Sequence, residues 1–206
     1  GEIIMKSRVG KEFKQMEHLI TQLKKLFKIA DEIGYPNLYV DGELYSDELP
    51  FEEISGYIRV EKTNPENERK IQYHIYDLPS HNGSFTQRWK ELNKLHNIMT
   101  ANSNMCCKLV STDQIDNMND LSAYYFDYMN NGYEGQMIRL DKPYENKRSK
   151  SLLKHKSFID EEYTILGVEE GIGNKTGMIG SFIFESKTGK TFNASPKFNW
   201  EECTKM

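Results

Sequence analysis

The sequence contains too few cysteines for a disulfide framework. Its 206 residues include three, Cys106, Cys107 and Cys203, and none has the spacing of a zinc site. We therefore expect a reducing, cytoplasmic environment. Long apolar runs are also missing, since no stretch approaches the length of a membrane span and no secretory signal is present. These absences argue against a disulfide-rich secreted domain and against a membrane partner.

The chain also lacks the overall positive charge of a typical nucleic-acid-binding protein, because its net charge is −4. The charge is unevenly distributed, however. From Arg139 to Lys156 the basic residues clearly outnumber the acidic ones. A local basic strip on an acidic chain suits a ligand that carries phosphates at one site only. Taken alone, a solvated charged loop explains the strip equally well.

The hydrophobic pattern predicts alternating helices and short strands. Apolar residues at three- and four-residue spacing from Phe13 to Phe27 predict an amphipathic helix that ends before Gly34. Two more helices are expected, one from Phe85 to Met99 with Ser84 as its cap, and one from Leu121 to Met129 closed by Asn131-Gly132. We expect strands at 2–5, 38–40, 71–76, 108–110, 163–168, 180–185 and 191–193. We also expect a polar loop at 61–70 and a hairpin turn at 187–190.

Three short segments carry side chains suited to nucleotide chemistry. Asp41-Gly42-Glu43 follows an apolar run, and residues two apart on a strand face the same side, so both carboxylates can converge on one cation. Glu134-Gly135 is the second segment and Leu153-Lys154-His155-Lys156 the third. By the same spacing Lys154 and Lys156 can face one phosphate. Carboxylate oxygens are the ligands that magnesium prefers.

Each segment taken alone has an ordinary structural explanation. Asp41-Gly42 could be a plain turn and Glu43 a solvated strand end. Tyr76, at the end of an expected strand, could be a core residue, and the two lysines of the third segment could lie on an exposed strand face. Only the joint occurrence of the segments in one order favours a functional interpretation.

That ordered set resembles the motifs of ATP-dependent DNA ligases, members of the covalent nucleotidyltransferase superfamily together with RNA ligases and mRNA-capping enzymes. The resemblance covers nearly the whole chain and rests on Ser7-Arg8, Asp41-Gly42-Glu43-Leu44, Ile75-Tyr76-Asp77, Glu134-Gly135 and Leu153-Lys154-His155-Lys156. The segments 157–162 and 177–181 favour DNA ligases over capping enzymes.

The resemblance implies a role for each motif. The arginine of the first motif faces the nick and the nucleotide sugar, the glutamate of the second holds the ribose, and the aromatic ring of the third stacks on adenine. The last two motifs serve the metal and the α-phosphate. The implied catalytic residues are Lys154, Lys156 and Arg8. The implied nucleotide-binding residues are the same three with Glu43, Tyr76 and Arg139. The implied metal ligands are Glu134, Asp41 and Glu43.

As a whole, the resemblance implies an α+β protein. It predicts a nucleotidyltransferase domain of antiparallel sheets with packed helices at residues 1–157, and part of an oligonucleotide-binding (OB-fold) β-barrel at 158–206. The implied activity is that of a minimal, virus- or phage-like DNA ligase, a monomer that seals nicks in double-stranded DNA through lysyl-adenylate and DNA-adenylate intermediates, with ATP and magnesium (Mg2+). The alternatives are an RNA ligase or mRNA-capping guanylyltransferase and, from another class, a non-catalytic nick-binding module.

The sequence departs from the ligase pattern in two places. No Lys-x-Asp-Gly occurs, and Tyr39-Val40-Asp41-Gly42 has tyrosine where the nucleophilic lysine would lie. The last basic motif of the second domain is missing as well, and the first expected strand begins almost at Gly1. We therefore expect a chain truncated at both ends that does not adenylylate itself.

Overall fold

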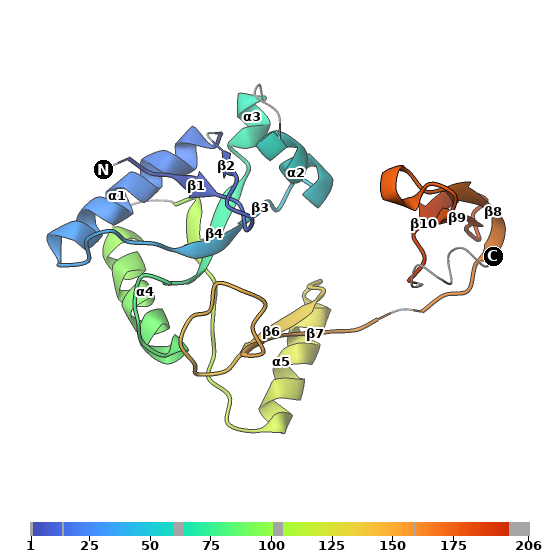
Figure 1. Cartoon of the computed structure of the whole chain (residues 1–206). Helices are drawn as coiled ribbons and strands as arrows, with labels where there is room; N and C mark the ends of the chain where they lie inside the picture. The colour runs from blue at the N-terminus through green and yellow to red at the C-terminus, as the bar shows by residue number, and fades with distance from the viewer. Residues whose placement is uncertain (1, 14, 60–63, 101–104, 159, 198–206) are drawn as a thin grey trace. The chain divides into compact units, whose positions relative to one another are not determined.

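Figure 1 shows the computed structural model, which describes residues 2–13, 15–59, 64–100, 105–158 and 160–197. The predictions made for Gly1, for the start of the expected loop at 61–63 and for Cys203 fall outside these residues. The chain divides into two compact units, Gly1–Lys156 and Ser157–Met206. Among the described residues no helix combines the length and apolar character required to cross a membrane.

The first unit mixes helices with short strands. Its elements in chain order are β1 (Met5–Lys6), β2 (Glu12–Phe13), α1 (Glu17–Glu32), β3 (Asp41–Tyr45), α2 (Phe51–Arg59), α3 (Pro65–Glu68), β4 (Gln72–Asp77), α4 (Phe85–Thr100), β5 (Cys107–Leu109), α5 (Met118–Asn130), β6 (Gly135–Arg139) and β7 (Leu152–Lys156). They form the sheets β1-β2, β3-β4-β5 and β6-β7. The pairs are antiparallel except for β4–β5, which is parallel because α4 carries the chain back between those two strands.

The core of the first unit lies between α1, α4 and the sheet β3-β4-β5 (Figure 1). Leu19, Leu23 and Leu26 form the buried stripe of α1, as the three- and four-residue spacing predicts. They join Ile75 from β4 and Leu92 from α4 in one apolar cluster. Burying each such side chain contributes roughly 1.5–3 kcal/mol, so this cluster is the main support for the strands around the site.

The predicted start of the first helix is wrong. Phe13 lies in β2 and pairs with Met5 of β1, so the first expected strand is also displaced, from 2–5 to Met5–Lys6. The helix begins only at Glu17, because Met16 adopts a left-handed conformation with φ 72°. The apolar spacing continues across this break, since Met16 is fully buried in the same core.

The strand expected at 38–40 is displaced as well. The ladder begins at Asp41, which pairs with Asp77, and runs to Tyr45. Residues before Asp41 pass beyond the end of β4, where Ser80 binds the backbone of Tyr39 in place of a strand partner. Asp41 and Glu43 therefore lie inside the strand and not at its exit.

Most other predicted elements are found, with small shifts. Residues 65–68 of the expected loop form the short helix α3, which Asn64 caps. The strand expected at 108–110 is β5, one residue earlier. Ser84 precedes α4 as predicted, but the side chain of Asp141 accepts from the amide of Thr86, so a distant residue contributes to this helix end.

The predicted end of α5 is confirmed. Gly132 has φ 83°, and its amide donates to the carbonyl of Met129. The amide of Tyr133 donates to the carbonyl of Tyr128, which completes a helix-ending motif that needs a left-handed residue. The turn leads directly into Glu134-Gly135 at the start of β6.

The second unit is an antiparallel sheet of order β10-β9-β8, made of β8 (Thr164–Glu170), β9 (Ile179–Glu185) and β10 (Thr191–Ala194), with a short helix η1 (Gly173–Lys175) between the first two. The predicted hairpin turn is confirmed, and Gly189 supplies its positive φ of 75°. Phe184 stacks on Phe192 across the pair. The described residues form no closed barrel, and their assignment to an OB-fold stays a prediction.

A buried ion-pair cluster joins the sheet β3-β4-β5 to the hairpin β6-β7 and to α4. The side chain of Asp77, at the end of β4, is 0% exposed. Arg88 of α4 donates to both carboxylate oxygens, with Nε 2.6 Å from Oδ1 and Nη2 3.2 Å from Oδ2. Arg139 of β6 adds a third bond, from Nη1 to Oδ2 at 2.5 Å. One carboxylate thus fixes β6 relative to β4 and α4.

Replacing this carboxylate should strongly destabilise the first unit. In Asp77→Asn the buried Arg88 and the partly buried Arg139 lose their counter-charge, which costs about 3–5 kcal/mol when one partner of a buried pair is removed. Urea unfolding followed by helix ellipticity measures the loss. Glu145→Gln, which removes an exposed pair with Lys147, should hardly move the midpoint. Equal midpoints for the two variants would contradict the central role of Asp77.

Candidate functional site

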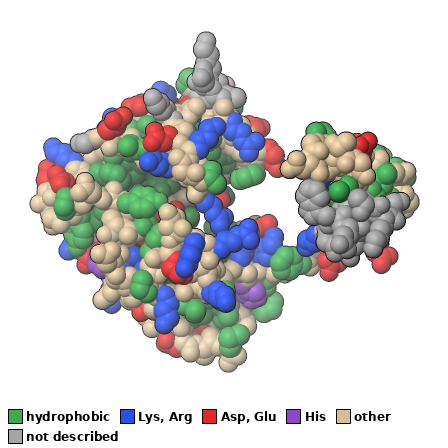
Figure 2. All heavy atoms as spheres, in the orientation of Figure 1, with side chains coloured by type: hydrophobic (Ala, Val, Ile, Leu, Met, Phe, Trp, Pro, Cys, Tyr) green, Lys and Arg blue, Asp and Glu red, His purple; other side chains and the backbone are tan. Residues whose placement is uncertain are grey.

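The hairpin formed by β6 and β7 brings one acidic and two basic side chains together. Lys154 and Lys156 are two apart on β7 and face the same side, as predicted. Glu134 Oε2 lies 2.7 Å from Lys154 Nζ, and Glu134 Oε1 lies 3.5 Å from Lys156 Nζ. The side chain of Glu134 is 71% exposed, so the cluster faces solvent and is open to a ligand. Lys and Arg side chains gather over this hairpin in Figure 2.

The other face of the hairpin is fastened to α5. Gln136 is buried and its side-chain amide donates to the carbonyl of Leu121, 3.0 Å away. The same amide nitrogen lies 3.0 Å from Nδ1 of His155, whose ring stacks on Tyr125 at 4.3 Å between centroids. Since His155 lies between Lys154 and Lys156, these contacts with α5 fix β7 through the face opposite to the two lysines.

The glycines of the two acidic motifs are required by close strand pairing. A Cβ on Gly135 would lie 2.9 Å from the Cα of Lys156, closer than real Cβ atoms come to backbone. A Cβ on Gly42 would lie 2.5 Å from the carbonyl oxygen of His74 on β4. In each case the missing side chain lets the neighbouring strand approach, and so places the adjacent carboxylate-bearing residue next to its partner strand.

The lysines alter the acidity of Glu134. A hydrogen bond from Lys154, and then the positive charges of Lys154 and Lys156, hold the pKa of this carboxyl below its usual range. Glu134 is therefore ionised at neutral pH. The stabilisation that the pair contributes is present above the ordinary glutamate pKa, and it is lost as the pH falls through the lowered value.

A second group of side chains surrounds Tyr76 at the end of β4. Its hydroxyl lies 3.4 Å from Asp41 Oδ1, and the hydroxyl of Tyr144 donates to Asp41 Oδ2 at 2.9 Å. The guanidinium carbon of Arg139 lies 5.1 Å from the centroid of the Tyr76 ring. Burial, and then the negative charge of Asp41, raise the pKa of Tyr76 to about 12, so the phenol stays neutral.

The remaining predicted residues are more dispersed. Arg8 is exposed in the turn between β1 and β2, and Glu43 is exposed on β3. Asp41 accepts from two tyrosine hydroxyls, while Glu134 pairs with lysines. Within the described part of the chain, no three His, Cys, Asp or Glu side chains form a cluster that could hold a metal ion. The magnesium assignment therefore stays a prediction.

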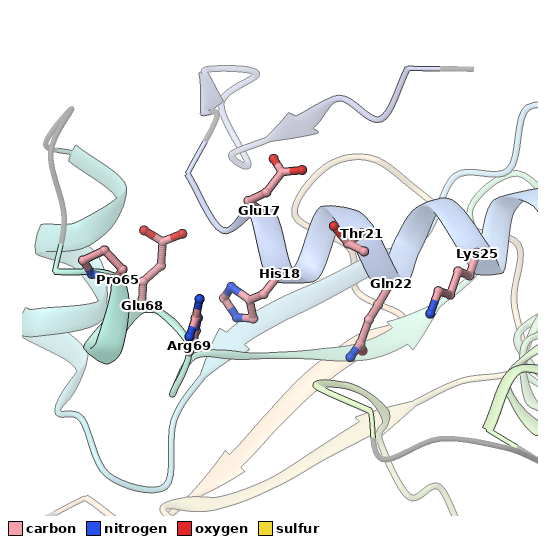
Figure 3. Close-up of a pocket in the computed structure, with 8 residues that line it drawn as sticks. All are labelled: Glu17, His18, Thr21, Gln22, Lys25, Pro65, Glu68 and Arg69. Carbon is pink, nitrogen blue, oxygen red and sulfur yellow. The ribbon is translucent and has the colours of Figure 1, made fainter.

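A pocket between α1 and α3 lies apart from these residues (Figure 3). It is lined by Glu17, His18, Thr21, Gln22, Lys25, Pro65, Glu68 and Arg69. Several of these side chains serve the framework. His18 Nε2 bonds the carbonyl of Ile71, and Gln22 Oε1 accepts from the amides of Cys106 and Cys107. The pocket shares no residue with the predicted site.

The sequence reasoning missed four residues that shape the site, namely Asp77, Arg88, Gln136 and Tyr144. Asp77 follows Tyr76, the residue predicted to stack on adenine, and this position in the sequence was the only indication that Asp77 belongs to the site. The others carried none, because Arg88 and Tyr144 meet the site only through contacts between residues far apart in the chain. Gln136 differs from an ordinary strand residue only by its burial.

Comparison with known proteins gives the family. Residues 1–156 match the model of the ATP dependent DNA ligase domain. The chain belongs to this family. It is 27% identical over 169 residues to a DNA ligase of Haemophilus influenzae, covering 82% of this chain and 61% of the relative. It is 25% identical over 203 residues to a DNA ligase of African swine fever virus, covering 96% of this chain and 46% of the relative.

Solved DNA ligases share the fold of this family member. A Lig E DNA ligase with a minimal DNA-binding scaffold matches with a TM-score of 0.74 and 26% identity, over 96% of this chain and 72% of that one. The Chlorella virus DNA ligase–adenylate matches with a TM-score of 0.58 and 22% identity, over 100% and 74%. The predicted fold class is thereby confirmed. The chain spans about half to three fifths of the length of the curated relatives above.

Removing Lys154 should raise the pKa of Glu134 toward the ordinary glutamate value. Lys154 supplies the larger hydrogen-bond contribution and the larger charge contribution, so Lys154→Ala should raise the pKa of Glu134 more than Lys156→Ala does. A carbon-13 NMR titration of the glutamate carboxyl carbons measures both shifts. Glu161, whose pKa is lowered by Lys187 in the second unit, is the internal control and should not change. A larger effect of Lys156→Ala would contradict the arrangement described.

Proposed function

We propose that this chain forms the nucleotide- and phosphate-binding part of an ATP-dependent DNA ligase that acts on nicked double-stranded DNA. The observation that carries the proposal is the cluster of Lys154, Lys156 and Glu134 on one face of the β6–β7 hairpin, within a domain of the ligase family. Neither an RNA ligase nor a capping enzyme is favoured, because the relatives described above are DNA ligases.

The lysines are suited to adenylyl transfer. Each step of the ligase reaction is a displacement at phosphorus, for which positioning and charge neutralisation provide most of the catalysis. Two ammonium groups side by side on β7 can offset the negative charge that grows on the α-phosphate in the transition state. Glu134 would keep both lysines oriented until the phosphate displaces it. The nucleophilic lysine of Lys-x-Asp-Gly is not among the residues of this chain.

The side chains present are better arranged to bind ATP than to bind a magnesium ion without it. Tyr76 offers an aromatic ring for the adenine, the lysines offer charge for the phosphates, and Glu43 is an exposed carboxylate for the ribose. Magnesium retains waters and takes few carboxylates, so Glu134 could hold it with Asp41 and Glu43 acting through water. When bound, the cation would neutralise phosphate charge.

The loop between β6 and β7 is suited to the phosphates of DNA. Its first part is fixed to the fold, because Asp141 accepts from α4 and the carbonyl of Lys142 accepts from Arg88. Its second part exposes Lys147, Arg148 and Lys150. Because the first part of the loop is held in place by hydrogen bonds, its basic second part loses little conformational entropy when it binds a phosphate backbone. The nicked state of the DNA, a monomeric ligase and a cytoplasmic location remain proposals.

The proposed role of Lys154 at the α-phosphate can be tested in a protein that joins this chain to a Lys-x-Asp-Gly segment. Lys154→Ala should slow covalent adenylylation by labelled ATP on the order of a hundredfold or more, because one charge-stabilising donor is removed. Lys24→Ala, an exposed lysine on α1, is the matched control and should leave the rate unchanged. Wild-type rates in Lys154→Ala would falsify the assignment.

DNA binding by the loop should appear in the salt dependence. The chain should bind nicked duplex weakly, with an affinity that falls steeply as salt rises. Replacing Lys147, Arg148 and Lys150 together by alanine should decrease the magnitude of the negative slope of log affinity against log salt. The decrease should reach up to about 0.9 for each DNA phosphate that the loop no longer neutralises.

The matched control for this experiment replaces Lys24, Lys25 and Lys28 of α1, which removes the same charge from another exposed surface. Both triple variants can be compared by fluorescence anisotropy at several salt concentrations. Equal slopes in the two variants would show that only net charge matters, and the loop assignment would fail.

A further inference from the structure

Arg139 is partly buried, and its guanidinium is engaged by other side chains of the protein. Its side chain is 18% exposed, and Nη1 lies 2.5 Å from Asp77 Oδ2. The guanidinium carbon lies 5.1 Å from the centroid of the Tyr76 ring and 4.9 Å from that of Phe85. Its charge is thus shared with a buried carboxylate, and its planar group contacts two aromatic rings.

These contacts differ from what a phosphate-binding arginine needs. Fork-shaped recognition uses an open edge of the guanidinium and a charge that is not already balanced. In this structure Asp77, which also pairs with Arg88, engages Nη1 of Arg139 and offsets part of its charge. The guanidinium approaches from β6 toward the end of β4 that carries Tyr76. The resemblance to DNA ligases implies only that Arg139 belongs to the nucleotide-binding residues, and fork-shaped recognition of phosphate is one way in which an arginine could serve there.

We propose that Arg139 is a positioning residue that holds the Tyr76 ring as the platform for the base, and that it does not contact the phosphates. This inference rests on the proposed function, since it concerns the same nucleotide site. The cation over the ring face restrains the ring by cation–π attraction, and the long contact from its hydroxyl to Asp41 restrains its rotation. A ring restrained in this way loses less freedom when a base stacks on it.

The two roles of Arg139 can be separated with two ligands. ATP uses both the base platform and the phosphate contacts, whereas inorganic tripolyphosphate uses the phosphate contacts alone. Arg139→Met should weaken ATP binding about threefold to tenfold, the range expected when one cation–π interaction is removed, and should leave tripolyphosphate binding unchanged. Isothermal titration calorimetry on the whole chain measures both affinities.

The fold should survive this change, because Arg88 still donates two bonds to Asp77. Arg139→Lys provides a second variant that keeps a cation beside Asp77 and Tyr76, and it should retain more of the ATP affinity than Arg139→Met does. Arg59→Met, which removes an exposed arginine from the end of α2, is the matched control and should change neither affinity.

A double variant tests whether Arg139 acts through the ring. Tyr76→Ala should itself weaken ATP binding, because the base–aromatic stack is removed, and adding Arg139→Met should then cause no further loss. A further loss in that background would overturn the proposal. If Arg139→Met weakens the binding of ATP and of tripolyphosphate equally, the proposal is overturned in favour of a phosphate contact. If it changes neither affinity, the proposal is overturned as well.

The result for the unmodified chain separates this inference from the function on which it rests. If the chain binds tripolyphosphate and ATP with the same affinity, no base platform operates and both proposals fail. If it binds ATP more tightly than tripolyphosphate and Arg139→Met keeps that difference, only the role of Arg139 fails.

Discussion

The carboxylate of Asp77 is the constraint on which the arrangement of the first unit depends. A fully buried charge is tolerated only when it is paired and hydrogen-bonded, and its partners come from two other elements, Arg88 from α4 and Arg139 from β6. Arg88 also donates to the carbonyls of Gly83 and Lys142. The loop before α4, the β6–β7 hairpin and β4 are therefore joined through one polar centre.

This polar centre has a direct consequence for the site. It sets the position of the β6–β7 hairpin relative to β4, and so the position of the lysine pair relative to Tyr76. The hairpin itself has two faces with separate tasks. Gln136 and His155 fasten one face to α5, while Lys154, Lys156 and Glu134 lie on the other. Stability and candidate chemistry thus use alternate residues of the same two strands.

Part of this arrangement could be predicted from the sequence. Period-two spacing placed Lys154 and Lys156 on one face, and an Asn-Gly pair correctly predicted the end of α5. The errors have a common cause. The strand expected at 38–40 begins at Asp41 because the ladder is defined by where its partner β4 ends. The helix expected from Phe13 starts later because the apolar residues before it belong to the same core without being helical.

The sequence by itself indicated the family, because its ordered motifs resemble those of DNA ligases. It also determined the residue types that the proposed chemistry needs, because these follow from side-chain chemistry and local spacing. Only the tertiary structure decided which of those side chains are open to a ligand. Arg139 has the right type and the right place in the motif, yet Asp77 engages its guanidinium. A contact between residues far apart in the chain depends on how the sheets pack, and spacing along the chain carries no record of that packing.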